Sequence, residues 1–173
     1  YGSGSRKALL VHGWSGRGTQ LYKIADELLQ NDFTVFSFDA PGHGKSPGNK
    51  SIMIEFIASI FELEKQFGPF DVAIGHSLGG MSLINSVSKG LQVRKLVSIS
   101  AGNVIHDIII DFVAKLKMKP KQEDLMRLYV EKTHKRPMDE LSADRNAKNI
   151  QVPTLIIHDK NDVEVAVSCA QEI

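Results

Sequence analysis

The sequence predicts an α/β fold with a mostly parallel, doubly wound sheet and helices on both of its faces. Short, continuous apolar runs recur along the chain, and segments with a helical apolar pattern lie between them. Such runs are typical of strands buried on both faces, as in a parallel sheet. Alternation of strands and helices implies right-handed crossovers, which place helices on both sides of the sheet. The predicted strands lie at 8–11, 33–38, 72–74, 96–99 and 155–157.

Three helices are expected between the first four strands. Apolar residues from Leu21 to Leu29 fall at i, i+3, i+4, i+7 and i+8, which is a single helical stripe. A longer amphipathic helix is predicted over 52–67, with Ser51 as its N-cap and Gly68-Pro69 as its stop. The third helix should follow Ser77 and end near Gly90.

Residues 103–149 interrupt this rhythm, because the segment is too long for a plain connection. It carries its own helical stripes, with a turn expected at 117–121 around Pro120. The stripe residues are Ile105, Ile109, Phe112 and Leu116, and then Leu125, Leu128 and Tyr129. We therefore predict a core made of 1–102 and 150–173, and a helical insertion at 103–149. The insertion leaves the sheet at its C-terminal edge, where open α/β sheets bind ligands, so we interpret it as a cap; an ordinary pair of surface helices is the alternative.

Composition narrows the class of partner. Of the 173 residues, 42% are hydrophobic and 24% are charged, as in an ordinary soluble domain, and the net charge is +1. That balance gives no electrostatic case for nucleic acid or an anionic membrane, and no apolar run is long enough for a membrane span. The single cysteine, Cys169, cannot form an internal disulfide, which fits a reducing compartment, and we expect a cytoplasmic one; a secreted protein that uses no disulfide is the alternative. We expect a small-molecule partner, and a homodimer stays open.

The segment Gly75-His76-Ser77-Leu78-Gly79 carries the strongest chemical signal. It matches Gly-x-Ser-x-Gly between a predicted strand and a predicted helix, the context of a nucleophile elbow. A sharp turn exposes the serine hydroxyl, and flanking glycines remove Cβ atoms that would clash there. The unpaired N–H groups of the helix N-terminus favour developing negative charge. Ser77 is therefore the predicted nucleophile, and a chance glycine-rich helix start is the alternative.

With three further motifs in the same order, the chain resembles the α/β-hydrolase superfamily from Lys7 to Ile173, in particular its small serine hydrolases with a helical cap. The first motif runs from Leu9 to Trp14. The resemblance implies an oxyanion hole built from the backbone amides of Trp14 and Leu78. It also implies that His12 ties the loop by a hydrogen bond and is not a base. Trp14 is expected either to wall the pocket or to lie in the core.

The second and third motifs lie at 38–46 and 152–165. In the second, Asp39 and its neighbouring glycines are expected to shape a turn, and contact of His43 with substrate is the minor alternative. In the third, Asp162 matches the place of the acid that orients the catalytic histidine, and Asp159 is expected to fix the loop. The alternative for Asp162 is a cap on the last helix.

The general base is missing from this set. The superfamily order is serine, acid, then histidine, and no histidine follows Asp162. We therefore expect a chain truncated at both ends, with the base beyond Ile173; a degenerate, non-catalytic relative is the alternative.

The resemblance implies a serine hydrolase of the esterase type that cleaves a carboxylic ester or related acyl bond through an acyl-enzyme, without metal or organic cofactor. Hydrolysis of amide, peptide or carbon–carbon bonds stays open. A serine at the elbow argues against dehalogenase and epoxide-hydrolase chemistry, which needs a carboxylate there. The second class is a hydrolase-fold module that binds a small molecule without turnover, and an interaction scaffold is the third.

Overall fold

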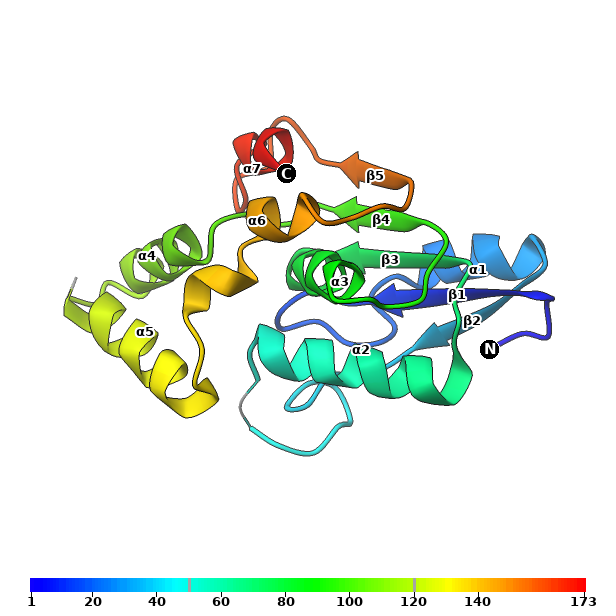
Figure 1. The fold of residues 1–173 in the computed structure, drawn as a ribbon, viewed down its shortest axis with the longest axis horizontal. Helices are drawn as coiled ribbons and strands as arrows, with labels where there is room; N and C mark the ends of the chain where they lie inside the picture. Colours follow the sequence, from blue (N-terminus) through cyan, green and yellow to red (C-terminus); the bar gives the residue numbers. More distant parts are fainter. Residues whose placement is uncertain (50, 120) are drawn as a thin grey trace.

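The computed structural model describes residues 1–49, 51–119 and 121–173, and its centre is a five-stranded sheet in the order β2-β1-β3-β4-β5 (Figure 1). The strands are β1 (Arg6–Val11), β2 (Phe33–Ser37), β3 (Val72–His76), β4 (Leu96–Ile99) and β5 (Thr154–Ile157). Every neighbouring pair is parallel. The chain steps outward from β1 to β2 and then continues on the other side of β1, which creates a topological switch between β1 and β3. The predicted doubly wound parallel sheet is confirmed.

Alternate residues of β1 point into two separate cores. Leu9 and Val11 join the core under α2 (Met53–Phe67) and α3 (Leu78–Ser88), whereas Ala8 and Leu10 join the core under α1 (Tyr22–Gln30). The predicted stripe of α1 packs on that second core. The sheet is therefore covered from both sides, as strand alternation requires.

The start of α2 differs from the prediction. Its N-cap is Ile52, whose backbone N–H donates to Oε2 of Glu55 at 2.8 Å. Ser51 is not the cap: its Oγ is buried and has no partner among the described residues. Because the third residue of the helix reaches back to the N-cap, the helix start is stabilised from within. The predicted end is confirmed, since α2 stops at Phe67 with Gly68 as C-cap.

The segment between β4 and β5 is helical and lies beside the C-terminal ends of the strands (Figure 1). It contains α4 (Ile105–Lys115), α5 (Lys121–His134), the 3₁₀ helix η1 (Met138–Leu141) and α6 (Ala143–Ala147). The short helix α6 packs against α3, and Ala143 is fully buried there. None of the described helices is long and apolar enough to cross a membrane.

The buried faces of α4 and α5 differ from the predicted stripes. On α4, Val113 joins Ile105 and Ile109 in the core, whereas Leu116 is 54% exposed. On α5, the contacts with the core come from Met126 and Val130, and the predicted stripe is exposed. The exposed residues of that stripe are Leu125, Leu128 and Tyr129. Residues 126 and 130 are one turn apart, so they share a face of their own. Pro120, expected in the turn, lies outside the described residues.

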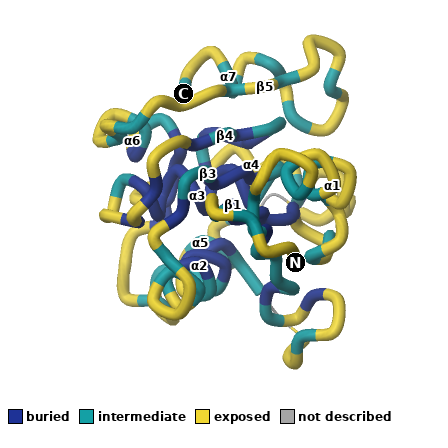
Figure 2. Tube along the Cα trace, turned by 90° about the vertical axis from the view of Figure 1, so that its right-hand side faces the viewer, coloured by how far each residue is buried: buried dark blue, intermediate teal, exposed yellow. Residues whose placement is uncertain are grey.

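The edge strand β5 is less buried than its apolar run predicts. Leu155 and Ile157 are 55% and 44% exposed, and Figure 2 shows β5 as a mostly exposed edge. They lie in register with Val97 and Ile99, on the side of the sheet that α1 covers elsewhere. Their exposure leaves this side of β5 largely uncovered in the described structure. The last helix, α7 (Ser168–Glu172), follows a loop at 158–167.

The first turn of α3 lies directly against the end of β1. A Cβ atom on Gly79 would lie 2.4 Å from the carbonyl oxygen of Val11 and 2.5 Å from that of His12. A Cβ on Gly75 would lie 2.5 Å from the carbonyl oxygen of Gly79. These neighbours are backbone atoms, so they cannot move aside as a flexible side chain would. Glycine at both positions is what lets α3 start this close to the sheet.

We expect Gly79→Ala to lower the free energy of unfolding by about 3 kcal/mol or more, because the new methyl group overpacks a backbone contact. Urea denaturation followed by circular dichroism measures this change. Gly90→Ala is the control: its φ is +100° but nothing lies within 4 Å of the new Cβ. It should cost about 1–2 kcal/mol from backbone strain alone. Equal losses in the two variants would contradict the close contact.

Candidate active site

Ser77 stands between the last residue of β3 and the first residue of α3, in an unusual backbone conformation. Its φ is +51° and its ψ is −119°, a region that residues other than glycine rarely occupy. The surrounding backbone holds it there: its N–H donates to the carbonyl of Ile99 at 2.8 Å, and its carbonyl accepts from the N–H of Met81 at 3.1 Å. Ser77 is half-buried and lines a cavity of about 540 Å³ with mostly apolar walls. The sharp turn expected from the sequence is thus present, and it opens on a pocket.

The loop after β1 lies against this turn. A Cβ on Gly13 would lie 3.2 Å from the Cβ of Ser77, so the two backbone segments are neighbours. The N–H of Leu78 belongs to the first residue of α3 and has no intrahelical acceptor. Neither this N–H nor that of Trp14 makes a hydrogen bond to another described residue. Two unpartnered amides beside a serine are what an oxyanion hole needs, and their catalytic role stays a prediction.

His12 is held by backbone groups at both of its ring nitrogens. Nδ1 donates to the carbonyl of Gly13 at 2.7 Å, and Nε2 accepts from the N–H of Ala40 at 3.0 Å. The ring is buried, and burial lowers its pKa, so it is neutral at physiological pH. His12 therefore ties the 12–14 loop to the chain after β2, the structural role expected of it, and has no free nitrogen for proton transfer.

Asp39 joins two other loops at the same edge of the sheet. Its carboxylate accepts from the N–H of Lys45 at 2.7 Å and from the N–H of Gly18 at 2.6 Å, and these two backbone hydrogen bonds lower its pKa. His43 accepts the N–H of Ser15 through Nε2 at 3.2 Å. Asp39 thus shapes the turn as expected, and His43 fixes the adjacent loop and is not among the residues that line the cavity.

Asp162 organises the loop after β5. Its Oδ1 accepts from the N–H of Val165 at 3.0 Å and from the N–H of Glu164 at 2.9 Å. These hydrogen bonds, led by that from Val165, lower the pKa of Asp162, so it is a carboxylate at neutral pH. Asp162 does not itself line the cavity; Glu164 and Val165 do. The candidate acid therefore lies one layer behind the pocket wall.

The sequence offered a helix cap as the alternative role of Asp162, and a role in fixing the loop for Asp159. Asp162 does not cap the last helix, because α7 begins at Ser168 with Val167 as its N-cap. Asp159 accepts the N–H of Asn161 at 2.8 Å and so fixes the turn, as expected of it.

The described residues give Ser77 no general base. His158 is buried, donates from Nε2 to the carbonyl of Val165 at 2.8 Å, and lies 3.7 Å from Oδ2 of Asp162. His76, next to the serine, has a buried Nδ1 without a described partner, and burial lowers its pKa although the charge of Asp162 opposes this. No described histidine hydrogen-bonds to Ser77. The structure thus brings together the candidate nucleophile and the amides but leaves the proton acceptor unassigned.

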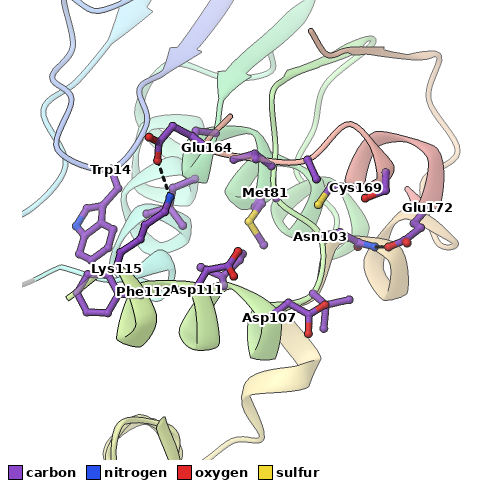
Figure 3. Close-up of a pocket in the computed structure, with 18 residues that line it drawn as sticks. Trp14, Met81, Asn103, Asp107, Asp111, Phe112, Lys115, Glu164, Cys169 and Glu172 are labelled. Atoms are coloured by element: carbon purple, nitrogen blue, oxygen red, sulfur yellow. Dashed lines mark hydrogen bonds and ion pairs between the residues drawn. The ribbon is translucent and has the colours of Figure 1, made fainter. Parts of the chain in front are cut away.

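The cavity wall includes Trp14, for which a place in the wall was one of the two expectations, and other residues that sequence reasoning did not single out as functional. Trp14 is 52% exposed, and its ring centroid lies 5.2 Å from that of Phe112 on α4, so Trp14 walls the pocket and is not a core residue (Figure 3). Asp107 and Asp111 of α4 also line the cavity. The sequence did hold a sign of this: the two residues are spaced i, i+4, which puts them together on a face of α4 other than its buried stripe.

Cys169 also lines the cavity. Burial raises the pKa of its thiol, so it is protonated at neutral pH and is a poor nucleophile. Among the residues that the structure describes, no three His, Cys, Asp or Glu side chains gather as a metal site would require.

The chain is similar to known esterases and lipases. It is 30% identical over 101 residues to the pimeloyl-[acyl-carrier protein] methyl ester esterase of Klebsiella pneumoniae subsp. pneumoniae, a match that covers 58% of this chain and 38% of that protein. The matching enzyme of Salmonella newport is 31% identical over 81 residues, covering 47% of this chain and 30% of the enzyme. This chain thus spans well under half of these curated relatives.

Solved structures share the fold over nearly the whole chain. The monoacylglycerol lipase of Paleococcus ferrophilus superposes with a TM-score of 0.71 at 21% identity, covering 99% of this chain and 80% of that one. The esterase of Exiguobacterium antarcticum gives a TM-score of 0.70 at 16% identity, covering 99% and 79%. At this level of identity, the likeness concerns the fold.

The family itself follows from a match that spans most of the chain. Residues 9–148 match the family described as alpha/beta hydrolase fold, and this range includes the end of β1, the elbow at Ser77 and most of the helical segment. The parallel sheet and the strained turn before α3 have the arrangement that this match predicts. The chain belongs to the alpha/beta hydrolase family.

Proposed function

We propose that this chain carries the nucleophile and oxyanion hole of a serine hydrolase that cleaves carboxylic esters or thioesters. One observation carries the proposal: Ser77 is held at a positive φ at the start of α3, on the wall of an apolar cavity. Strain of this kind persists only when the surroundings enforce it, and it clusters at functional sites. The esterases and lipases among the similar proteins support the same class of chemistry.

In the proposed reaction, Oγ of Ser77 attacks the carbonyl carbon of the ester while a base removes its proton. The carbonyl oxygen becomes an oxyanion, which accepts hydrogen bonds from the amides of Trp14 and Leu78. The N-terminus of α3 adds its partial positive charge at the same place. Collapse expels the alcohol or thiol, which takes the proton, and water then releases the acid and restores Ser77.

Asp162 is proposed as the acid that orients the base. Its lowered pKa keeps it ionised at the pH where such a base works, and its backbone hydrogen bonds fix its position. The base that the family resemblance implies is a histidine later in the chain order, and none follows Asp162 in these 173 residues. Activity is tested on the natural full-length protein.

We also propose that residues 103–149 act as a cap. The observation that favours this role over that of ordinary surface helices is that α4 supplies part of the wall of the cavity that Ser77 and Leu78 also line. Substrate selection would then depend on α4 rather than on the sheet.

A binding module without turnover is the second candidate. It is favoured by the absence of a hydrogen bond between Ser77 and any described histidine. The two candidates differ in one property, which is whether Ser77 reacts.

We expect a fluorophosphonate probe to label the full-length protein once per chain at Ser77, because the probe captures activated serines and its phosphoryl oxygen occupies the oxyanion hole. Mass spectrometry of the labelled peptide measures this. Ser77→Ala should abolish labelling, whereas Cys169→Ser, which changes the cysteine on the cavity wall, should leave it intact. Folded wild-type protein that stays unlabelled would favour the binding module.

We expect Asp162→Asn to slow ester hydrolysis by about 10²–10⁴-fold, because the amide cannot stabilise the imidazolium that forms on the base. The asparagine oxygen can still accept the N–H groups of Glu164 and Val165, so the loop should keep its shape. Initial rates with p-nitrophenyl esters measure the loss. Asp159→Asn serves as control and should change the rate less than about threefold, since no role in orienting the base is assigned to it. A similar loss in both variants would mean that the loop, not the carboxylate of Asp162, matters.

A further inference from the structure

The side of α4 that faces the cavity carries two carboxylates one helical turn apart. Asp107 and Asp111 both line the cavity, and Figure 3 shows them on the stretch of α4 that borders it. Both residues are exposed, and neither forms an ion pair with a described residue. Their charges therefore act on whatever enters the pocket.

The described part of the chain offers the cavity one cationic side chain, Lys115, and that charge is already matched. Its Nζ donates to Oε2 of Glu164 at 2.6 Å, the contact drawn as a dashed line in Figure 3. This hydrogen bond raises the pKa of Lys115, so its ammonium group stays charged at neutral pH. The fourth carboxylate of the wall, Glu172, accepts a hydrogen bond from Nδ2 of Asn103 at 2.8 Å. The wall therefore has a surplus of negative charge.

The remaining wall is apolar and suits a hydrocarbon chain. Trp14 and Phe112 pack against each other at one side, and Met81 and Ile108 also line the space. A chain placed among them would gain from burial without needing polar partners.

We propose, on the basis of the proposed function, that this hydrolase takes neutral apolar acyl chains and rejects chains that end in a carboxylate, with Asp107 and Asp111 as the specificity-determining residues. A terminal carboxylate would be placed near two like charges in a space where protein replaces part of the water, so the repulsion is screened less than in bulk solvent. Building repulsion against the wrong ligand is a general route to specificity.

The test compares two ligands of equal chain length, dimethyl suberate and monomethyl suberate, which differ in one terminal carboxylate. Binding is measured by isothermal titration calorimetry on full-length Ser77→Ala protein at neutral pH, so that no ester is cleaved. We expect the monoanion to bind at least about tenfold more weakly than the diester, which corresponds to about 1.4 kcal/mol. Equal affinities would overturn the proposal, and so would failure of the diester to bind.

Methyl 8-aminooctanoate separates repulsion from the cost of desolvating any charge. If desolvation alone weakened binding of the monoanion, binding of this cation of similar length would be weakened as much. We expect the cation to bind at least about fivefold more tightly than the monoanion. Equal weakening of the two charged ligands would assign the effect to desolvation and overturn the role of the carboxylates.

The residues are tested with the double variant Asp107→Asn and Asp111→Asn, which should reduce the preference for the diester to less than about threefold. The matched control is Asp26→Asn with Glu27→Gln on α1, which changes the net charge equally on the opposite side of the sheet and should keep the full preference. All four positions are exposed, so both variants should fold. A preference that persists in the α4 variant would overturn the assignment.

These results are independent of the chemistry at Ser77. Labelling of Ser77 together with equal binding of both suberates would contradict the proposed charge selectivity and support the proposed hydrolase. Selective binding without labelling would contradict the proposed hydrolase and support a charge-selective pocket.

Discussion

The site depends on a contact between two backbone segments, in which the first turn of α3 lies against the last carbonyls of β1. Gly79 leaves no room for a Cβ beside Val11 and His12, and Gly75 leaves none beside Gly79. If α3 moved away from the sheet, the turn at Ser77 would relax, and the hydrogen bond from its N–H to Ile99 would be lost. The strained φ of the serine is therefore a consequence of helix–sheet packing.

The same contact places the two amides proposed as oxyanion donors. Because β1 continues into the 12–14 loop, whatever holds α3 against β1 also brings Trp14 close to Leu78. His12 then fixes that loop from behind through Ala40 and Gly13. The donors are main-chain groups on rigid elements, which is the preorganisation that stabilisation of a developing charge requires. The part of the pocket next to Ser77 is thus shaped mainly by backbone, and Ser77 supplies the proposed nucleophile.

Much of this could be predicted from the sequence because it depends on local signals. Apolar runs predicted the parallel strands, and glycines at fixed offsets within a strand–turn–helix context predicted the sharp turn at Ser77. The errors arose where tertiary contacts decide between local options. Ser51 and Glu55 could each satisfy the start of α2, and only the folded geometry shows that Glu55 does. In α5, the chain offers two apolar faces, and packing selects the one with Met126 and Val130.

The wall of the pocket could not be predicted for the same reason. Asp107 and Phe112 line it because of how α4 is placed over the sheet edge, and no motif fixes that placement. Sequence patterns identify which face of a helix is apolar, but not what the other face meets.

The pocket side and the core side of α4 are separate, and this affects how the protein could change its substrate. Residues on the pocket side of α4 do not contribute to the core through those side chains, since the helix is anchored by Ile105, Ile109 and Val113 on another face. Substitutions at 107 or 111 therefore alter the charge of the wall at little expense in stability, because both positions are exposed and unpaired with described residues. The turn at Ser77 has no such freedom, because its neighbours are carbonyl oxygens at contact distance. The proposed chemistry and the proposed selectivity thus depend on separate elements, one fixed by backbone packing and the other open to change one side chain at a time.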